Sequence, residues 1–220
     1  MLSLILAAAA AAAPAAPALP ADGSYTYVSS MNGAAVGKTV VTIKRTAGGV
    51  VLSEQGGGTY NGQQGTLADT LTLDPSMLAP TNYSLRAVVD GRPVNAALAF
   101  KGASAVQSGD MLQKTYDLTP GAAHFVVLDV GPFSGWFALP AQLHAWNGAP
   151  ALAIVPEFGS GVPIAPDTSS KAAPPAGVPA ADASISVTTP MPFTLWYDPA
   201  AMLVDRLDFP TQGITINRTP

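Results

Sequence analysis

The stretch Pro192-Phe193-Thr194-Leu195-Trp196-Tyr197-Asp198-Pro199 decides how this sequence of 220 residues is interpreted. Aromatic and β-branched residues fill it, and Asp198-Pro199 ends it with a turn signal. Two further runs of the same kind follow at 203–209 and 213–218. The pattern predicts three successive antiparallel strands. Within the first strand, Phe193, Leu195 and Tyr197 should share one face, with Trp196 on the other.

The rest of the chain repeats this pattern of short alternating runs between turn signals. Asn32-Gly33, Asn61-Gly62 and Asp90-Gly91 each separate two such runs, and these dipeptides favour tight hairpin turns. With 21 Gly and 21 Pro, the sequence also has many places where a long helix would have to end. The composition therefore favours many short strands.

One segment has helical spacing instead. In Ser134–Trp146 the large apolar residues fall roughly on one side of a helix. Pro140 suits a first helical turn, so the helix begins either at Ser134 or only near Leu139. After it, residues 156–182 are rich in proline and alanine and have no period, which indicates a long flexible loop.

These elements predict an all-β, mainly antiparallel fold. A sheet of so many strands must curl, split or close. We expect a curved sheet or half-barrel packed on one short helix, with a long Pro/Ala-rich loop.

The first 21 residues differ from the rest. An apolar run at 2–13 precedes small residues and prolines, as in a secretory signal peptide cleaved after Ala18 or Ala21. A disordered Ala/Pro-rich leader is the alternative, because no Lys or Arg precedes the run. The first interpretation predicts a periplasmic or secreted protein whose single β-rich domain spans 22–220, with no transmembrane segment in the mature chain.

Composition excludes several function classes. The net charge of −4 and the lack of a Lys/Arg cluster argue against nucleic acid as a partner. The absence of cysteine excludes thiolate metal sites and Cys nucleophiles. No nucleotide-binding or zinc-protease motif occurs, and Gly56-Gly57-Gly58 is interpreted as a strand end or bulge. We therefore predict no cofactor, no metal and no catalytic residue.

Two sets of polar residues are candidate sites. His124 and His144 are the only histidines, and a hydrolase would need one of them beside a carboxylate. Asp198, Asp205 and Asp208 form the nearest approach to an acidic cluster. A turn opener and two strand-edge charges explain these acids more simply.

Aromatic residues are the stronger candidates for a binding site. Ligand pockets are concave, mostly apolar and hold a few polar groups. The alternative is that the aromatic residues simply form the core. The groove candidates are Trp136, Phe137, Trp146, Phe193, Trp196 and Tyr197.

Three short motifs carry a resemblance over residues 24–218. They are the opening 25–37, the corner Leu73-Asp74-Pro75 with Leu78-Ala79-Pro80, and the closing 195–199. Together they resemble uncharacterised bacterial periplasmic antiparallel β-proteins, similar in architecture to the lipoprotein-carrier (LolA/LolB-like) half-barrels. The resemblance implies an envelope protein that binds an acyl chain or a protein partner, and residues 156–181 depart from it.

Three functions remain open on the sequence alone. The first is a non-enzymatic exported domain that holds a lipid, another apolar ligand or a polypeptide in an aromatic-lined groove. The second is a structural or interaction module with a filled core. The third is a hydrolase that uses His124 or His144.

Overall fold

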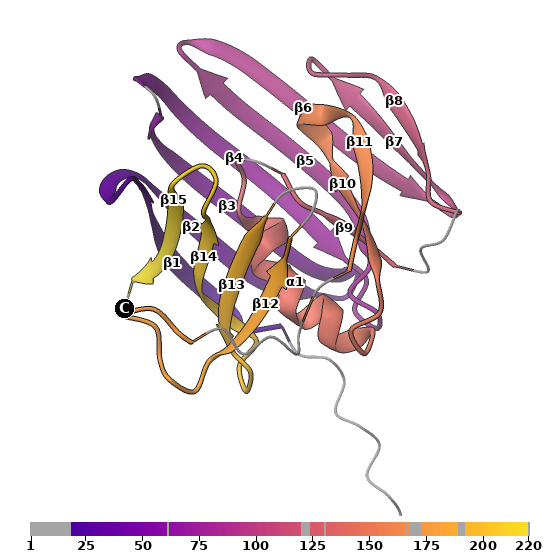
Figure 1. Ribbon diagram of the computed structural model, residues 1–220. Coiled ribbons are helices and arrows are strands. Elements are labelled where there is room, and N and C mark those ends of the chain that lie inside the picture. Colours follow the sequence, from indigo (N-terminus) through magenta and orange to yellow (C-terminus); the bar gives the residue numbers. More distant parts are fainter. Residues whose placement is uncertain are drawn as a thin grey trace, which may run out of the picture.

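The computed structural model describes residues 19–60, 62–119, 124–129, 131–165, 167, 173–188 and 192–219. Within them, a 12-stranded antiparallel sheet has the order β12-β13-β14-β15-β1-β2-β3-β4-β5-β6-β7-β8 (Figure 1). The predicted all-β fold with one short helix is confirmed. Its strands are β1 (Gly23–Met31), β2 (Ala34–Thr46), β3 (Gly49–Tyr60), β4 (Gln63–Leu73), β5 (Pro80–Val89), β6 (Arg92–Lys101), β7 (Ser104–Gly109), β8 (Lys114–Asp117), β12 (Ala183–Val187), β13 (Phe193–Asp198), β14 (Leu203–Phe209) and β15 (Ile214–Thr219).

Tight turns join the long strands, as the sequence predicts. Asn32 and Gly33 both have positive φ, at 50° and 83°, and Asp90 and Gly91 repeat this at 49° and 77°. Two positive φ values in a row are the geometry of the two-residue hairpin turn that matches strand twist. The predicted Asn61-Gly62 turn lies partly outside the described residues.

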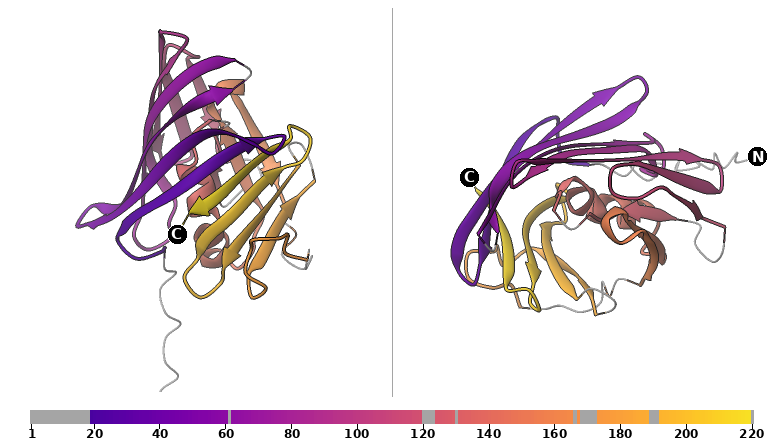
Figure 2. Two further views of the ribbon diagram at one scale, coloured as in Figure 1. Left: turned by 90° about the vertical axis from the view of Figure 1, so that its left-hand side faces the viewer. Right: turned by 90° about the horizontal axis from the view of Figure 1, so that it is seen from above.

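The C-terminal stretch forms the three predicted strands, but they do not end the sheet. β15 pairs with β1, with Tyr27 opposite Arg218, so the two ends of the described chain lie side by side within the sheet. β12 and β8 are the edges in the described part of the chain. In this part of the chain the sheet is therefore open, and Figure 2 shows that it is curved.

A helix and a second sheet lie on the concave side (Figure 2). Helix α1 (Ser134–Ala145) begins at Ser134 and continues through Pro140, so the later start near Leu139 is wrong. Residues 134–143 are all buried, and the helix therefore has no solvent-facing side there. The second sheet has the order β11-β10-β9, from β9 (Phe125–Val127), β10 (Ala151–Val155) and β11 (Ser160–Ile164).

The prediction of a loop without regular structure over 156–182 is wrong for its first part. A 3-10 turn, η1 (Pro156–Phe158), leads into β11, which pairs with β10 along its whole length. Backbone pairing to an apolar neighbouring strand outweighs the local proline signal, because Pro163 lies in an edge strand.

An aromatic core fills the space between α1 and the sheet. The indole of Trp136 meets Phe193 and Phe209 edge-on, at 4.9 and 5.1 Å between ring centroids. Tyr27 packs on Phe133 at 4.6 Å. Aromatic contacts of these two kinds, edge-on and tilted, add to the stabilisation from burial. The core thus holds α1 in a set position on the sheet.

Candidate functional site

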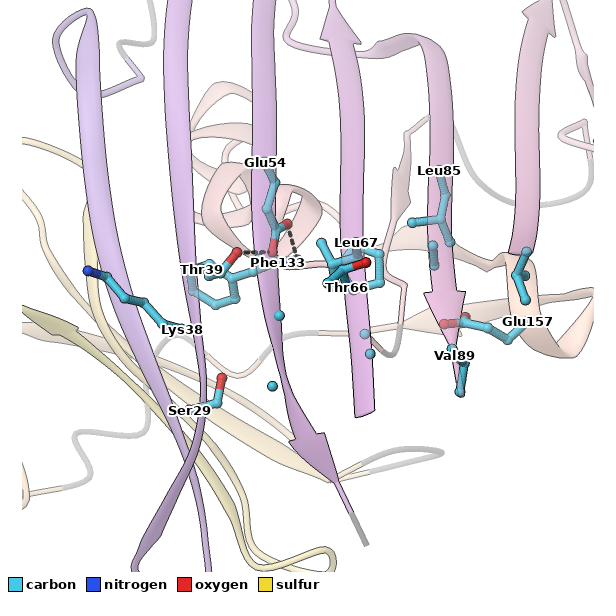
Figure 3. A pocket seen from close by; sticks show the side chains of 18 of the residues that line it. Ser29, Lys38, Thr39, Glu54, Thr66, Leu67, Leu85, Val89, Phe133 and Glu157 are labelled. Atoms are coloured by element: carbon cyan, nitrogen blue, oxygen red, sulfur yellow. Dashed lines mark hydrogen bonds between the residues drawn. The ribbon is translucent and has the colours of Figure 1, made fainter. Parts of the chain in front are cut away.

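The concave face also carries a hollow of about 340 Å³, beside the start of α1 (Figure 3). Cross-strand pairs place its floor in two rows. Five strands contribute the first row, one residue each: Thr39, Gly56, Leu67, Ala87 and Val94. The second row contributes Ser29, Gly58, Gly65 and Val89. Met111, the segment 131–133 and Glu157 complete the lining.

The hollow differs in polarity from one end to the other. Leu67, Ala87 and Val94 make the floor of the β4–β6 end apolar, although Figure 3 shows the carboxylate of Glu157 beside Val89 at this end. At the β1–β3 end the lining includes Ser29, Thr39 and Glu54. An apolar cavity with a few convergent polar groups is the usual form of a small-molecule site.

Glu54 is buried at the polar end of the hollow and forms hydrogen bonds with the start of α1. Its Oε2 accepts hydrogen bonds from the backbone N–H groups of Phe133, at 2.5 Å, and Ser134, at 2.9 Å. Its Oε1 accepts the hydroxyl of Thr39 at 2.5 Å. α1 has no capping side chain of its own, so a carboxylate from the sheet satisfies its first free N–H groups.

Asp69 lies directly opposite Glu54 on the neighbouring strand. Burial, followed by the charge of Glu54, raises the pKa of Asp69 well above its usual range. Burial also raises the pKa of Glu54, although its hydrogen bonds from Thr39 and the α1 backbone oppose this. Two adjacent buried carboxyls cannot both ionise easily. Because Glu54 receives three donors, we place the shared proton on Asp69, which also accepts the hydroxyl of Ser134.

Further acids lie close to this pair. Tyr83 donates its hydroxyl to the buried Asp129. Burial raises the pKa of Tyr83 well above its usual range, and the charges of Asp129, Asp69 and Glu157 raise it further. Of these acids, Glu54 and Glu157 line the hollow, and the Glu54 carboxylate disfavours an anion beside it.

Glycine residues leave part of the floor of the hollow without side chains. A Cβ on Gly56 would lie 2.6 Å from the Oγ1 of Thr39, its cross-strand partner. Gly56-Gly57-Gly58 pairs with both neighbouring strands in continuous register, so the predicted strand end or bulge is wrong. The run is a strand interior without side chains, at a place where the neighbouring strand approaches closely.

The six predicted groove residues lie elsewhere. Trp136, Phe137, Trp146, Phe193 and Trp196 are all buried, and Tyr197 is half-buried. None of the six lines the 340 Å³ hollow. Trp136 and Phe193 border only a narrow void of about 30 Å³. Ligand binding by these six residues stays a prediction, and the alternative that they form core agrees with their burial.

The other candidates have ordinary structural surroundings. The imidazole of His124 stacks on Trp146 at 4.7 Å, and His144 lies in the last turn of α1. Asp198 accepts the backbone N–H of Ala200 at 2.8 Å, as a turn opener does. The other two acids pair with arginines: Asp205 with Arg218 at 2.5 Å and Asp208 with Arg206 at 2.8 Å.

Among the described residues, no three His, Asp or Glu side chains are placed to hold a metal ion. No helix in the same part of the chain is both long and apolar enough to cross a membrane.

Comparison with known proteins adds little to the geometry. No family model and no curated protein matches the sequence. Among solved structures, the chain is similar to the crystal structure of a DUF1089 family protein from Pseudomonas aeruginosa, at 12% identity and a TM-score of 0.46. The alignment covers 96% of this chain and 97% of that one. The comparisons do not show the resemblance to the lipoprotein carriers, which stays a prediction.

Proposed function

We propose that this chain is a non-enzymatic β-domain that binds a small apolar ligand in the hollow on its concave face. The observation that carries the proposal is the hollow itself, with a floor of small and aliphatic residues beside a buried polar end. A volume near 340 Å³ lies within the range of about 300–1,000 Å³ that is usual for ligand pockets. The proposed binding surface is aliphatic, in place of the aromatic groove expected from the sequence.

The exposed apolar side chains around the hollow support the same proposal. Val89, which lines the hollow, is 39% exposed, and Ala87 and Leu67 are half-buried. Burying such surface under a ligand would stabilise the complex by about 25 cal/mol per Å².

We propose further that the protein is exported, because the apolar run at 2–13 has the form of a signal peptide. Of the two predicted cleavage positions, the one after Ala18 would keep the native contacts. Leu19 is only 3% exposed, and its carbonyl accepts a 2.7 Å hydrogen bond from Arg45. Cleavage after Ala21 would remove both contacts. N-terminal sequencing of the mature protein tests this choice.

Filling the hollow tests the binding function. Ala87 lies between Leu67 and Val94 across the strands, so the Ala87→Phe side chain would occupy the cavity. Ala99→Phe is the matched control, because Ala99 is exposed and lies outside the lining. We expect the neutral fluorophore N-phenyl-1-naphthylamine to bind the wild type and the control. Ala87→Phe should bind it at least about tenfold more weakly, a loss of about 1.4 kcal/mol.

Thermal melting of both variants separates lost binding from lost folding. Equal probe affinity in wild type and a folded Ala87→Phe variant would show that the hollow is not the site. No binding by the wild type, together with ligand-free native mass spectra of protein purified from its own envelope, would contradict the function.

A structural or interaction module is the second candidate. The observation that favours it is the filled aromatic core under α1. In that case the hollow would be a surface irregularity, and its filling by Ala87→Phe would change no binding activity.

A further inference from the structure

The hollow selects the chemistry of the ligand's polar end. Building on the proposed function, we propose that the ligand is a small amphiphile whose polar end donates a hydrogen bond, as an alcohol or an alkylammonium does, and is not a carboxylate. Its aliphatic part would lie over Leu67, Ala87 and Val94, and its polar end beside Thr39 and Ser29.

Thr39 gives the direction of the hydrogen bond. Its side chain lines the hollow, is only 7% exposed, and donates its single hydroxyl proton to Glu54 at 2.5 Å. A hydroxyl has one proton to donate and two lone pairs that accept. With its proton held by Glu54, Thr39 can offer a ligand only acceptor capacity. A group that reaches this oxygen must therefore donate.

Glu54 makes this arrangement hard to reverse. Its carboxylate accepts from Thr39 and from two backbone N–H groups at the start of α1. These groups are fixed by the helix, so Glu54 cannot turn away to release the Thr39 hydroxyl. Glu54 itself is nearly saturated and would act on the ligand through Thr39 and through its charge.

Ser29 provides the second polar contact. It lies on β1, diagonally across from Thr39 on β2. The register between β1 and β2 shifts between Ser29 and Ser30, which marks a bulge there. Its side chain lines the hollow, and Figure 3 shows its hydroxyl directed toward the other lining residues. Within the described part of the chain its hydroxyl has no protein partner, so it is available to a ligand.

Charge disfavours a carboxylate at this end. Glu54 lies at this end of the hollow next to Thr39, whereas Figure 3 shows Glu157, the other lining acid, beside Val89 at the opposite end. Lys38 is the only cation among the lining residues, and Figure 3 shows its ammonium directed away from them. An anionic end would therefore lie beside the Glu54 carboxylate without a counter-charge directed toward it, whereas an alcohol or an ammonium would not be repelled there.

A series of ligands with one tail and different ends tests the inference. We would measure the displacement of N-phenyl-1-naphthylamine by octane, 1-octanol, octylammonium and octanoate at pH 7 on the wild-type protein. We expect 1-octanol and octylammonium to bind at least about tenfold more tightly than octanoate, as expected for one hydrogen bond at a charged network. Ser29→Ala should weaken 1-octanol severalfold and leave octane unchanged.

The outcomes separate this inference from the proposed function. If octane and the fluorophore bind but octanoate binds as tightly as 1-octanol, the inference is wrong and the apolar site stands. If Lys38→Ala then abolishes octanoate binding, the polar end is an anion held by Lys38. If no member of the series binds, the proposed function itself fails.

Discussion

The two ends of the concave face are built on the same strands yet differ in what covers them. On β3, Leu52 is fully buried in the core, whereas Gly56, two inward positions further, floors the hollow. On β5, Tyr83 is buried and Ala87 lines the hollow. The aromatic side chains of α1 fill one end, and small residues leave the other open. Side-chain size and the position of α1, more than the shape of the sheet, therefore decide which part of the concave face stays open.

A boundary row of four paired residues divides the two ends: Val41, Glu54, Asp69 and Leu85. Helix α1 begins at this row, because Glu54 accepts its first backbone N–H groups. The carboxyl pair therefore marks the point where the packed core ends.

The largest expected effect is at the filled end. Trp136→Ala removes a buried indole that packs on Phe193 and Phe209 and donates its Nε1–H to Asp129. We expect a loss of about 3–5 kcal/mol in the free energy of unfolding, measured by urea denaturation. Phe158→Ala is the control, because Phe158 is 67% exposed and its loss should cost no more than about 0.5 kcal/mol. A cost below about 1 kcal/mol for Trp136→Ala would contradict the view that the aromatic core under α1 stabilises the filled end of the concave face.

The boundary row should give the next largest effect. Glu54→Gln replaces one acceptor oxygen by an amide N–H₂ at a position that three donors surround. We therefore expect a loss of about 1–3 kcal/mol in the free energy of unfolding at pH 7. Asp69→Asn instead imitates a protonated Asp69: its N–H₂ can donate to Glu54 while its oxygen accepts from Ser134. Its stability should equal or exceed that of the wild type. The reverse order in urea denaturation would place the shared proton on Glu54.

The smallest effect is the pH dependence of stability. Because the folded pKa of Asp69 is raised, the folded state binds more protons than the unfolded state above about pH 4. The contribution of Asp69 to stability should therefore be largest below that pH and fall as the pH rises toward its folded pKa. Asp182, whose pKa is raised to about 7, contributes in the same direction.

The difference between the wild type and Asp69→Asn isolates the pair, since Asp182 is common to both. We expect the advantage of Asp69→Asn to grow as the pH rises from about 4 to 8 in urea denaturation. A difference that does not vary with pH would mean that Asp69 is ionised throughout.

Most of the fold follows from local sequence patterns. Alternation, the turn dipeptides and the helical spacing of residues 134–146 predict the strands, hairpins and α1. The start of α1 could not be decided from Pro140 alone, because burial on all sides outweighs the lost hydrogen bond. β11 was missed for a similar reason, since its partner β10 supplies the pairing.

The site was less predictable, although one signal was present. Leu67, Leu71 and Leu73 share a face by period two, and Asp69 falls on that same face. A carboxyl at an inward position of an apolar strand indicates a buried acid. Its partner Glu54 is adjacent only through strand register, which the sequence does not specify. Most of the aromatic residues predicted to line a groove are buried instead, because a large apolar side chain indicates burial better than it indicates ligand contact.

The most direct test is to map where a ligand binds. We would add 1-octanol to the isotopically labelled protein and follow methyl and indole signals by NMR. We expect shifts centred on the methyl groups of Leu67, Ala87 and Val94, with the Nε1–H signals of Trp136 and Trp146 unchanged, since both donate to backbone carbonyls in the interior. Shifts centred on those indoles, or no saturable shifts at all, would contradict it.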